Sequence, residues 1–554
     1  MTRLASLCLI SAFLWNTSAL AQGKKFKKNP NPDIGFQATG KNGAVCAGGA
    51  EAVAAGIGIL KKGGNAADGA VATILALTVT DSERVCFGGE VPIMFYDAKR
   101  NAVELLCGLG TAPRLATREY FEKKGIPKKG IESAAVPGLV DACITALDRF
   151  GTISFADAAA PTLAILDRHE KPWHADLAKT IRYMIVAEVL ADDRKTGLRR
   201  ASDVFYRGHV AKSIADWCSA NGGLIRYTDL ATHVTRNEEP IAVPYRDHFV
   251  YKCGVWNQGP YLLQTLLMLE KFDLKKMGHN QPDTIHVMAE AMKLALADRD
   301  AYYADPLFVD VPIELMLSRR YTALRWPLID MKKASLVRQP GDPRGMKPIL
   351  ENPPHEQFGK GDNKDTTTCV VADKWGNVVA ATPSGFNGVI AGKTGVQLGT
   401  RLVSLNTWKG HPNCIEPGKR PRITLTPGIV IKDGKPLMAI SVAGGDLQDQ
   451  TALQVMLNVL DFGMTPAEAV SAPRFATNHH LGSFNQMPPV LGSLVLYPEF
   501  PKTTFEDLAA RGHKITTPVK NRHLAEPSII VIDPKTGVLS TAGDPRGKRH
   551  AAAY

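Results

Sequence analysis

The sequence predicts an α+β protein in which β-hairpins and α-helices occupy mostly separate stretches of the chain. Paired runs of β-branched and apolar residues, each joined by a short turn, lie within residues 92–106, 366–384 and 429–442. The stretch from Gly138 to about residue 330 instead repeats its apolar residues at helical spacing. With 554 residues, 45% of them hydrophobic and 22% charged, the chain can bury a large core and has the composition of a globular protein.

The first predicted elements alternate between the two types. A strand over residues 44–46 precedes a helix over 50–62, whose apolar residues fall on one face, and Gly63-Gly64 provides the left-handed stop. A second helix begins near Asn65. Strands over 92–96 and 102–106 then form a hairpin. We interpret this region as scaffold.

The middle of the chain is predicted to be mostly helical, with apolar faces over residues 140–150, 155–168, 261–271 and 284–303. His286 lies on the last of these helices, where a single histidine is more often a core or surface residue than a ligand. Asp298-Arg299-Asp300 offers local ion pairs of a structural kind. Residues 338–365 have the Pro, Gly, Asn and Asp content of an exposed loop, and a loop of that length usually has a function.

Two more hairpins follow near the carboxyl end, one around Asp433-Gly434 and one over residues 528–541. The first runs into Gly444-Gly445-Asp446 and a helix over 447–461, which gives the order strand, double glycine, acidic cap, helix. Backbone N–H groups at such a helix start favour negative charge. A plain tight turn is the alternative interpretation of the two glycines taken alone.

The hairpin over residues 366–384 has a register that can be derived from its turn. If residues 374–376 form a three-residue loop with Gly376 in the left-handed conformation, Asp373 pairs with Asn377. Thr366 then lies opposite Ser384. Directly opposed residues have Cβ atoms about 5 Å apart, so we expect the two hydroxyl groups to hydrogen-bond.

This hairpin resembles the processing site of the γ-glutamyltranspeptidase family, in which an acidic or amide residue precedes Thr-Thr, Val-Val, a Gly-Asn turn and a Thr/Ser pair. Companion motifs in the family's order extend the resemblance over nearly all of the chain after its first residues: Gly63-Gly64-Asn65-Ala66-Ala67-Asp68, Phe87-Gly88-Gly89, Val136-Pro137-Gly138, Ala291-Met292-Lys293-Leu294-Ala295, Pro417-Gly418-Lys419-Arg420-Pro421 and Gly444-Gly445. The resemblance implies an N-terminal-nucleophile hydrolase with a four-layer αββα sandwich.

The resemblance also implies roles for individual residues. Thr366 matches the nucleophile, Ser384 the hydroxyl that supports it, and Gly444 and Gly445 the oxyanion amides. A threonine hydroxyl needs a base, and its own α-amine, which titrates near 8, can act as one. That amine exists only after the Asp365-Thr366 bond is cut, and the same hydroxyl can attack the Asp365 carbonyl to cut it. No metal or cofactor is expected.

The positions that hold the substrate in the family are altered here. Leu109 stands where the family has an arginine that grips the substrate α-carboxylate, and Arg401 and Ser404 align near the amide and acid that hold the α-amine. Arg401 and Arg422 offer cations that could grip a carboxylate instead, and we expect Arg401 to serve the substrate and not self-cleavage. The remaining changes are Phe386 for an asparagine, and Ile423 and Thr424 for paired serines.

Three functions remain open from the sequence. The leading hypothesis is a self-processing hydrolase or acyltransferase that acts on γ-glutamyl or related acyl amides of small molecules. The altered substrate positions suggest an amidase or acylase for a carboxylated acyl group that lacks an α-amine. The third is a non-catalytic exported binding protein on the same fold.

The amino terminus predicts export. Arg3, an apolar run over residues 4–15 and Ala19-Leu20-Ala21 give a cleavable signal over residues 1–21, too short for a membrane span. The predicted large subunit is then residues 22–365, and the small subunit is 366–554. No later run reaches 18 apolar residues, so we expect a periplasmic or secreted protein with no membrane attachment. The net charge of +12 comes without a nucleic-acid-binding motif, so no nucleic-acid partner is expected.

Cysteines are sparse in this sequence. One of the nine, Cys8, lies in the predicted signal, and the other eight are spread from Cys46 to Cys414. This placement indicates isolated buried thiols and no disulfide framework or paired metal ligands.

Overall fold

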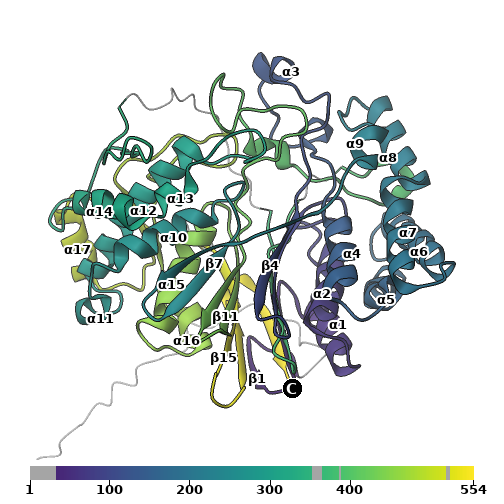
Figure 1. Ribbon diagram of the computed structural model, residues 1–554, viewed down its shortest axis with the longest axis horizontal. Helices are drawn as coiled ribbons and strands as arrows, with labels where there is room; N and C mark the ends of the chain where they lie inside the picture. Colours follow the sequence, from purple (N-terminus) through teal and green to yellow (C-terminus); the bar gives the residue numbers. More distant parts are fainter. Residues whose placement is uncertain (1–32, 352–364, 386–388, 519–523) are drawn as a thin grey trace, which may run out of the picture.

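The computed structural model describes residues 33–351, 365–385, 389–518 and 524–554. Two seven-stranded sheets face each other, and helices cover the outer face of each sheet (Figure 1). This is the predicted four-layer αββα arrangement. The predicted signal over residues 1–21, Phe386 and residues 352–364 of the predicted loop over 338–365 lie outside the described residues.

The first sheet holds the predicted processing hairpin at its centre. Its strand order is β17-β2-β8-β9-β3-β4-β5, and its described pairs are antiparallel. Strands from before and after Asp365 alternate here, because the β8–β9 hairpin lies between β2 and β3. The bounds are β2 (Gly43–Ala47), β3 (Val91–Asp97), β4 (Ala102–Gly108), β5 (Arg236–Glu238), β8 (Cys369–Asp373), β9 (Val378–Ala381) and β17 (His550–Ala553).

The second sheet has the strand order β1-β16-β15-β11-β10-β7-β6 and contains both hairpins predicted near the carboxyl end. A smaller sheet of three strands, β12-β13-β14, lies apart from it in the topology. The bounds are β1 (Gln37–Gly40), β6 (Ile241–Tyr245), β7 (His248–Lys252), β10 (Gly428–Lys432), β11 (Lys435–Ala443), β12 (Phe475–Ala476), β13 (Ser493–Leu496), β14 (Lys514–Thr516), β15 (Glu526–Ile532) and β16 (Leu539–Gly543).

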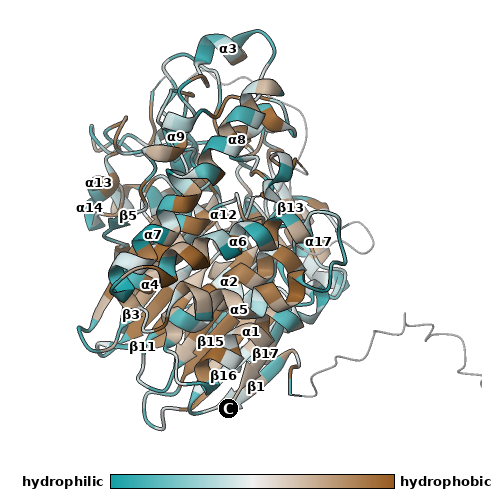
Figure 2. Ribbon diagram, turned by 90° about the vertical axis from the view of Figure 1, so that its right-hand side faces the viewer, coloured by the Kyte–Doolittle hydropathy of each residue, from teal (hydrophilic) through white to brown (hydrophobic). Residues whose placement is uncertain are grey.

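Helices over the first sheet form two shells. The helix α2 is buried along almost its whole circumference, because α4 and α5 pack on its outer side (Figure 2). A capping box between Asn65 and Asp68 starts α2 and explains the Gly-Gly-Asn-Ala-Ala-Asp motif. The helices on this side are α1 (Ala50–Lys61), α2 (Ala66–Thr80), α4 (Leu139–Phe150), α5 (Phe155–Leu166), α6 (His174–Val189), α7 (Arg194–Tyr206) and α8 (His209–Ala220).

The second sheet is covered mainly by α10 (Gly259–Leu269), α12 (Pro282–Tyr302), α15 (Leu447–Leu460) and α16 (Pro466–Ser471). Three apolar cores follow from these layers, one under each helical layer and one between the two sheets. The core between the sheets includes Cys46, Met94, Val370 and Ile530, all at most 2% exposed. The two sheets therefore form one continuous packing unit around the start of β8.

The predicted helices and hairpins are confirmed to within a few residues, and one stretch differs. The prediction of a mostly helical stretch up to residue 330 was wrong for residues 236–252, which form β5, β6 and β7. All eight described cysteines are buried and free, as expected. Among the described residues, none of the helices has both the length and the apolar character needed to span a membrane.

Candidate active site

The β8–β9 hairpin has the register derived from its turn. Gly376 adopts a left-handed φ of 87°, and the Asp373 amide donates to the Asn377 carbonyl at 3.1 Å. Continuing that register pairs Thr366 with Ser384 in an antiparallel bridge. The prediction that these two residues face each other is confirmed.

The Thr366 hydroxyl lies beside the peptide bond that precedes it. Its Oγ1 donates to the carbonyl oxygen of Asp365 at 2.6 Å, and Ser384 Oγ donates to the same carbonyl oxygen. The two hydroxyl oxygens are 3.4 Å apart, and both residues are at most 4% exposed. The Asp365 carbonyl therefore accepts hydrogen bonds from both hydroxyl groups.

A buried guanidinium lies behind Ser384. Arg401 Nη2 donates to Ser384 Oγ at 2.7 Å, and Arg401 Nε donates to Glu90 Oε1 at 2.6 Å. Burial lowers the pKa of Arg401, but the carboxylates of Glu90 and Asp365 outweigh it and hold that pKa above its usual value. Because Ser384 accepts from a cation while donating to the Asp365 carbonyl, its hydroxyl is a stronger donor than an isolated serine.

The side chain of Asp365 lies in the same buried network. Its Oδ2 accepts from Thr400 Oγ1 at 3.2 Å and lies 3.8 Å from Arg401 Nη2. Burial raises the pKa of the nearby Glu90, the Arg401 charge opposes that rise, and the Asp365 carboxylate adds to it. Two carboxylates thus share one guanidinium.

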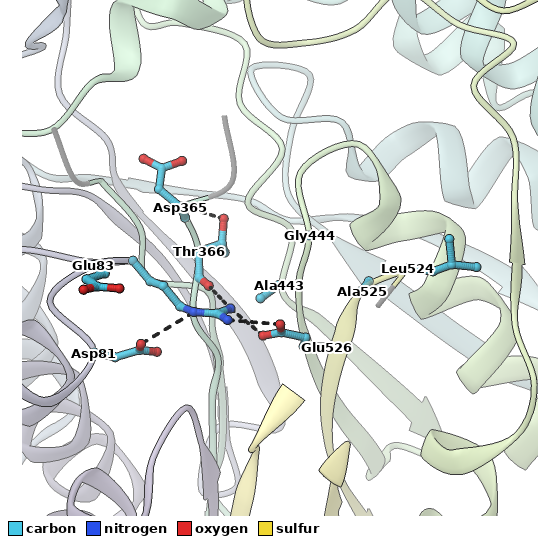
Figure 3. Close-up of a pocket in the computed structure, with 10 residues that line it drawn as sticks. Asp81, Glu83, Asp365, Thr366, Ala443, Gly444, Leu524, Ala525 and Glu526 are labelled. Atoms are coloured by element: carbon cyan, nitrogen blue, oxygen red, sulfur yellow. Dashed lines mark hydrogen bonds and ion pairs between the residues drawn. The ribbon is translucent and has the colours of Figure 1, made fainter. Parts of the chain in front are cut away.

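The double glycine forms a sharp turn between β11 and α15. Gly444 has φ 147° and Gly445 φ 59°, conformations that side-chain-bearing residues rarely adopt. Gly444 lines a cavity of about 290 Å³ together with Thr366 and Asp365 (Figure 3). The turn is thus positioned next to the predicted nucleophile.

Asp446 occupies the N-cap position of α15, as predicted, but its side chain does not cap the helix. The Asp446 side chain makes no cap hydrogen bond and instead accepts from Arg299 at 2.6 Å and from the Ser483 hydroxyl at 2.5 Å. Arg299 also pairs with its neighbour Asp300 at 2.7 Å, as the local ion-pair interpretation expected. This buried arginine fixes the turn from the α12 side.

The other wall of the cavity carries charge. Arg84 forms an ion pair with Glu526 at 2.5 Å and donates to the Thr366 carbonyl at 3.4 Å, with Asp81 and Glu83 also lining the cavity (Figure 3). Sequence reasoning missed this arginine, which follows α2 in a short turn.

Gln448 is a second residue that sequence reasoning missed. Its amide nitrogen reaches the carbonyls of Val442 and Thr424, at 2.9 and 2.8 Å, in one of its two orientations. In that orientation its Oε1 occupies the position 3.5 Å from Thr366 Oγ1 and 3.4 Å from Thr424 Oγ1. It can accept from the Thr424 hydroxyl, and from the Thr366 hydroxyl whenever that proton is not donated to the Asp365 carbonyl. The signal for it was its place in the first turn of the helix after the double glycine.

Glu90 was missed as well, although its position explains the Phe87-Gly88-Gly89 motif. The backbones of Glu90 and Ser384 pair, with both N–H groups donating across at 2.9 and 3.0 Å. A Cβ atom on Gly89 would lie 2.2 Å from the Ser384 carbonyl oxygen, so only glycine fits. A charged residue directly after this apolar, glycine-containing run was the available signal.

The three remaining predicted substrate residues have different surroundings. Ser404 is buried, and its Oγ has no hydrogen-bond partner among the described residues. Arg422 contacts Asp300 at 3.4 Å and Ser483 at 3.0 Å, and burial followed by the neighbouring Arg299 lowers its pKa to about 10. Leu109 is 3% exposed and packs in an apolar cluster with Trp256 and Ile423.

Metal ligation has one candidate cluster in the described parts of the chain, formed by His286, Glu290 and His513. Most of their ligand atoms are already hydrogen-bonded within the protein, and His513 Nδ1 is the exception among the described residues. His286 Nδ1 and His513 Nε2 share a hydrogen bond of 2.8 Å, and Glu290 pairs with Lys293 at 2.6 Å. None of them lines the Thr366 cavity, and His286 is a core residue, as the sequence suggested.

Comparisons with known proteins agree with this geometry. The family model for gamma-glutamyltranspeptidase matches residues 52–182 and 176–554. The chain belongs to the γ-glutamyltranspeptidase family. The glutathione hydrolase proenzyme of Escherichia coli strain K12 is 30% identical, covering 99% of this chain and 97% of the relative. The acylase ACY 1 proenzyme of Pseudomonas sp. strain SE83 is also 30% identical, covering 86% and 88%.

The fold comparison leads to the same family. A crystal structure of cephalosporin acylase from Bacillus halodurans is similar with a TM-score of 0.78 and 27% identity, covering 97% of this chain and 99% of that one. The architecture is that of the N-terminal-nucleophile hydrolases, and the chain is a γ-glutamyltranspeptidase-like amide hydrolase or acyltransferase. The family contains both glutathione hydrolases and acylases, so membership leaves the acyl group open.

Proposed function

We propose that the chain cuts itself between Asp365 and Thr366, and that the freed Thr366 is the nucleophile for turnover. The observation that carries this proposal is the 2.6 Å contact of Thr366 Oγ1 with the Asp365 carbonyl, a carbonyl that also accepts from Ser384. The relatives named proenzymes support it. The products would be a large chain of residues 22–365 and a small chain of 366–554.

Maturation follows from this geometry in two steps. Thr366 Oγ attacks the Asp365 carbonyl carbon and forms an ester, the C–N bond breaks, and the hydroxyl proton passes to the nitrogen, which leaves as the new α-amine. Ser384, with Arg401 behind it, stabilises the oxyanion that forms on the Asp365 oxygen. Water then hydrolyses the ester, which releases the Asp365 carboxylate and restores the Thr366 hydroxyl.

Turnover uses the same oxygen with a new base. The Thr366 α-amine takes the hydroxyl proton as Oγ attacks a substrate amide, and the proton passes to the leaving amine. Gly444 and Gly445 would supply amides to the oxyanion, and Gln448 would orient the hydroxyl. Water or an amine acceptor then removes the acyl group.

The acyl group has two candidates. The relatives named glutathione hydrolase favour a γ-glutamyl group. The relatives named acylase admit other acyl groups. The buried guanidinium of Arg401 favours an acyl group without an α-amine, because a cation repels an ammonium and attracts a carboxylate. We place the second candidate first, with the enzyme exported through its amino-terminal signal.

Amide hydrolysis by the purified two-chain protein tests the function. A γ-glutamyl anilide and a panel of simple acyl anilides are compared, with Thr366→Ala as the control. The proposal requires anilide release by the processed wild type and none by the variant. An unprocessed wild type that cleaves no amide would overturn it.

A further inference from the structure

The first acyl group that Thr366 receives is the protein's own. In the ester formed during maturation, the acyl carbon belongs to Asp365 and is attached to the same oxygen that later carries the substrate acyl group. The groups around the Asp365 side chain in the precursor are therefore the groups that can contact the side of an acyl group attached to Thr366. This reasoning rests on the proposed function.

The Asp365 carboxylate lies where a cation and a hydroxyl converge. Its Oδ2 lies 3.2 Å from Thr400 Oγ1 and 3.8 Å from Arg401 Nη2. Thr400 is 2% exposed and Arg401 is 0% exposed, so both contacts are made inside the protein. A carboxylate at this point is shielded from water, which strengthens its attraction to the guanidinium.

One nitrogen of the Arg401 guanidinium is unpaired in the described part of the chain. Its Nε and Nη2 serve Glu90 and Ser384, whereas Nη1 has no hydrogen-bond partner in the described part of the chain. An unpaired guanidinium nitrogen in the interior is costly, and a carboxylate on a free ligand can satisfy it. The 3.8 Å separation leaves Asp365 outside hydrogen-bonding distance of Arg401, and a ligand without a peptide tether can approach more closely.

We propose that Arg401 and Thr400 form a carboxylate subsite that selects amides of four-carbon dicarboxylic acids, of which a succinyl amide is the simplest. In Asp365 two carbons separate the reacting carbonyl from the carboxylate, and the same two carbons do so in a succinyl group. A γ-glutamyl group places its carboxylate one carbon further away and adds an ammonium. The subsite therefore disfavours it by length and by charge.

Anilides test this with the processed wild-type protein. The specificity constant kcat/KM is compared for succinyl, glutaryl and γ-glutamyl p-nitroanilides and for succinamyl p-nitroanilide, the uncharged isostere. Because a hydrogen bond to a charged group contributes about 1.5–3 kcal/mol, succinyl should exceed succinamyl by roughly 10- to 100-fold. Equal constants for those two, or a higher constant for glutaryl or γ-glutamyl, would overturn the inference while leaving amide hydrolysis by Thr366 intact.

A matched pair of threonine variants places the effect at the subsite. Thr400→Val should lower the succinyl-to-succinamyl ratio by about 5-fold, because it removes one hydrogen bond to the carboxylate. Thr394→Val is the control, since Thr394 is also buried but its hydroxyl bonds to nearby backbone groups, donating to the Ala391 carbonyl at 2.7 Å and accepting from the Val396 N–H at 3.1 Å. A ratio that Thr400→Val leaves unchanged, or that both variants lower equally, contradicts the assignment.

Maturation gives a test that needs no substrate. Asp365→Asn keeps the shape of the acyl group and removes its charge, so it should slow self-cleavage by about 10-fold through the lost attraction to Arg401. Self-cleavage at the wild-type rate in this variant would show that the subsite does not recognise a carboxylate. If the wild type cleaves itself but hydrolyses none of the anilides, the turnover function itself fails, and the inference fails with it.

Discussion

Removing the Ser384 hydroxyl should slow self-cleavage strongly. The hydroxyl donates to the Asp365 carbonyl and accepts from Arg401 Nη2 at 2.7 Å, so Ser384→Ala removes the link between the developing oxyanion and the Arg401 cation. A hydrogen bond to a charged group contributes about 1.5–3 kcal/mol, and loss of one oxyanion donor typically slows a reaction about 100- to 1000-fold. We therefore expect cleavage to be at least 10-fold slower.

The assay is a time course of precursor made by cell-free synthesis, with the two chains separated by gel electrophoresis. Ser441→Ala is the matched control, because Ser441 is also fully buried and hydrogen-bonds to a neighbouring hydroxyl, Thr382 Oγ1, at 2.9 Å. The reasoning is refuted if Ser384→Ala precursor is cut at the wild-type rate, or if both serine variants slow cleavage to the same extent.

Three further predictions concern other parts of the account. Gly444→Ala places a Cβ 2.8 Å from that of Ala525. It should reduce anilide turnover about 100-fold and slow self-cleavage less. Equal losses in the gel and anilide assays would argue against separate oxyanion donors for the two reactions. Arg401→Gln should slow self-cleavage about 10-fold in the gel assay, contrary to the expectation from sequence, and an unchanged rate would remove Arg401 from maturation. Burial, followed by the nearby Lys293, lowers the pKa of His513 to about 3. Between pH 6.5 and 3 the unfolded chain therefore binds one proton more at this residue than the folded chain does. The free energy of unfolding should fall as pH falls through that window, by up to about 1.4 kcal/mol per pH unit. His513→Gln should reduce the difference between the free energies of unfolding measured in urea at pH 7 and at pH 5. A difference as large as that of the wild type would contradict the assigned titration.

The sequence alone was sufficient for the hairpin at the site, because its register depends on a local turn. Gly376 fixes the loop, and the two-residue period of a strand then places Ser384 opposite Thr366. The missed β6–β7 hairpin has no such signal, since its turn places Arg246 at φ 55° where glycine or asparagine is usual. Local turn chemistry thus decided which hairpins could be predicted.

Contacts across layers could not be derived in this way. Glu90 and Arg401 are 311 positions apart and meet only because β3 and the segment after β9 converge at Ser384. The sequence placed Arg401 near the substrate by alignment, but its pairing with Glu90 and its hydrogen bond to Ser384 required the folded structure. The same holds for Arg299, whose side chain reaches Asp446 from another helix.

The most direct test of the central claim is the intact mass and amino-terminal sequence of the chains in purified protein. The account predicts two chains, the smaller beginning at Thr366, and a single uncut chain for Thr366→Ala. A small chain that begins elsewhere, or a Thr366→Ala protein cut at the same bond, would contradict it.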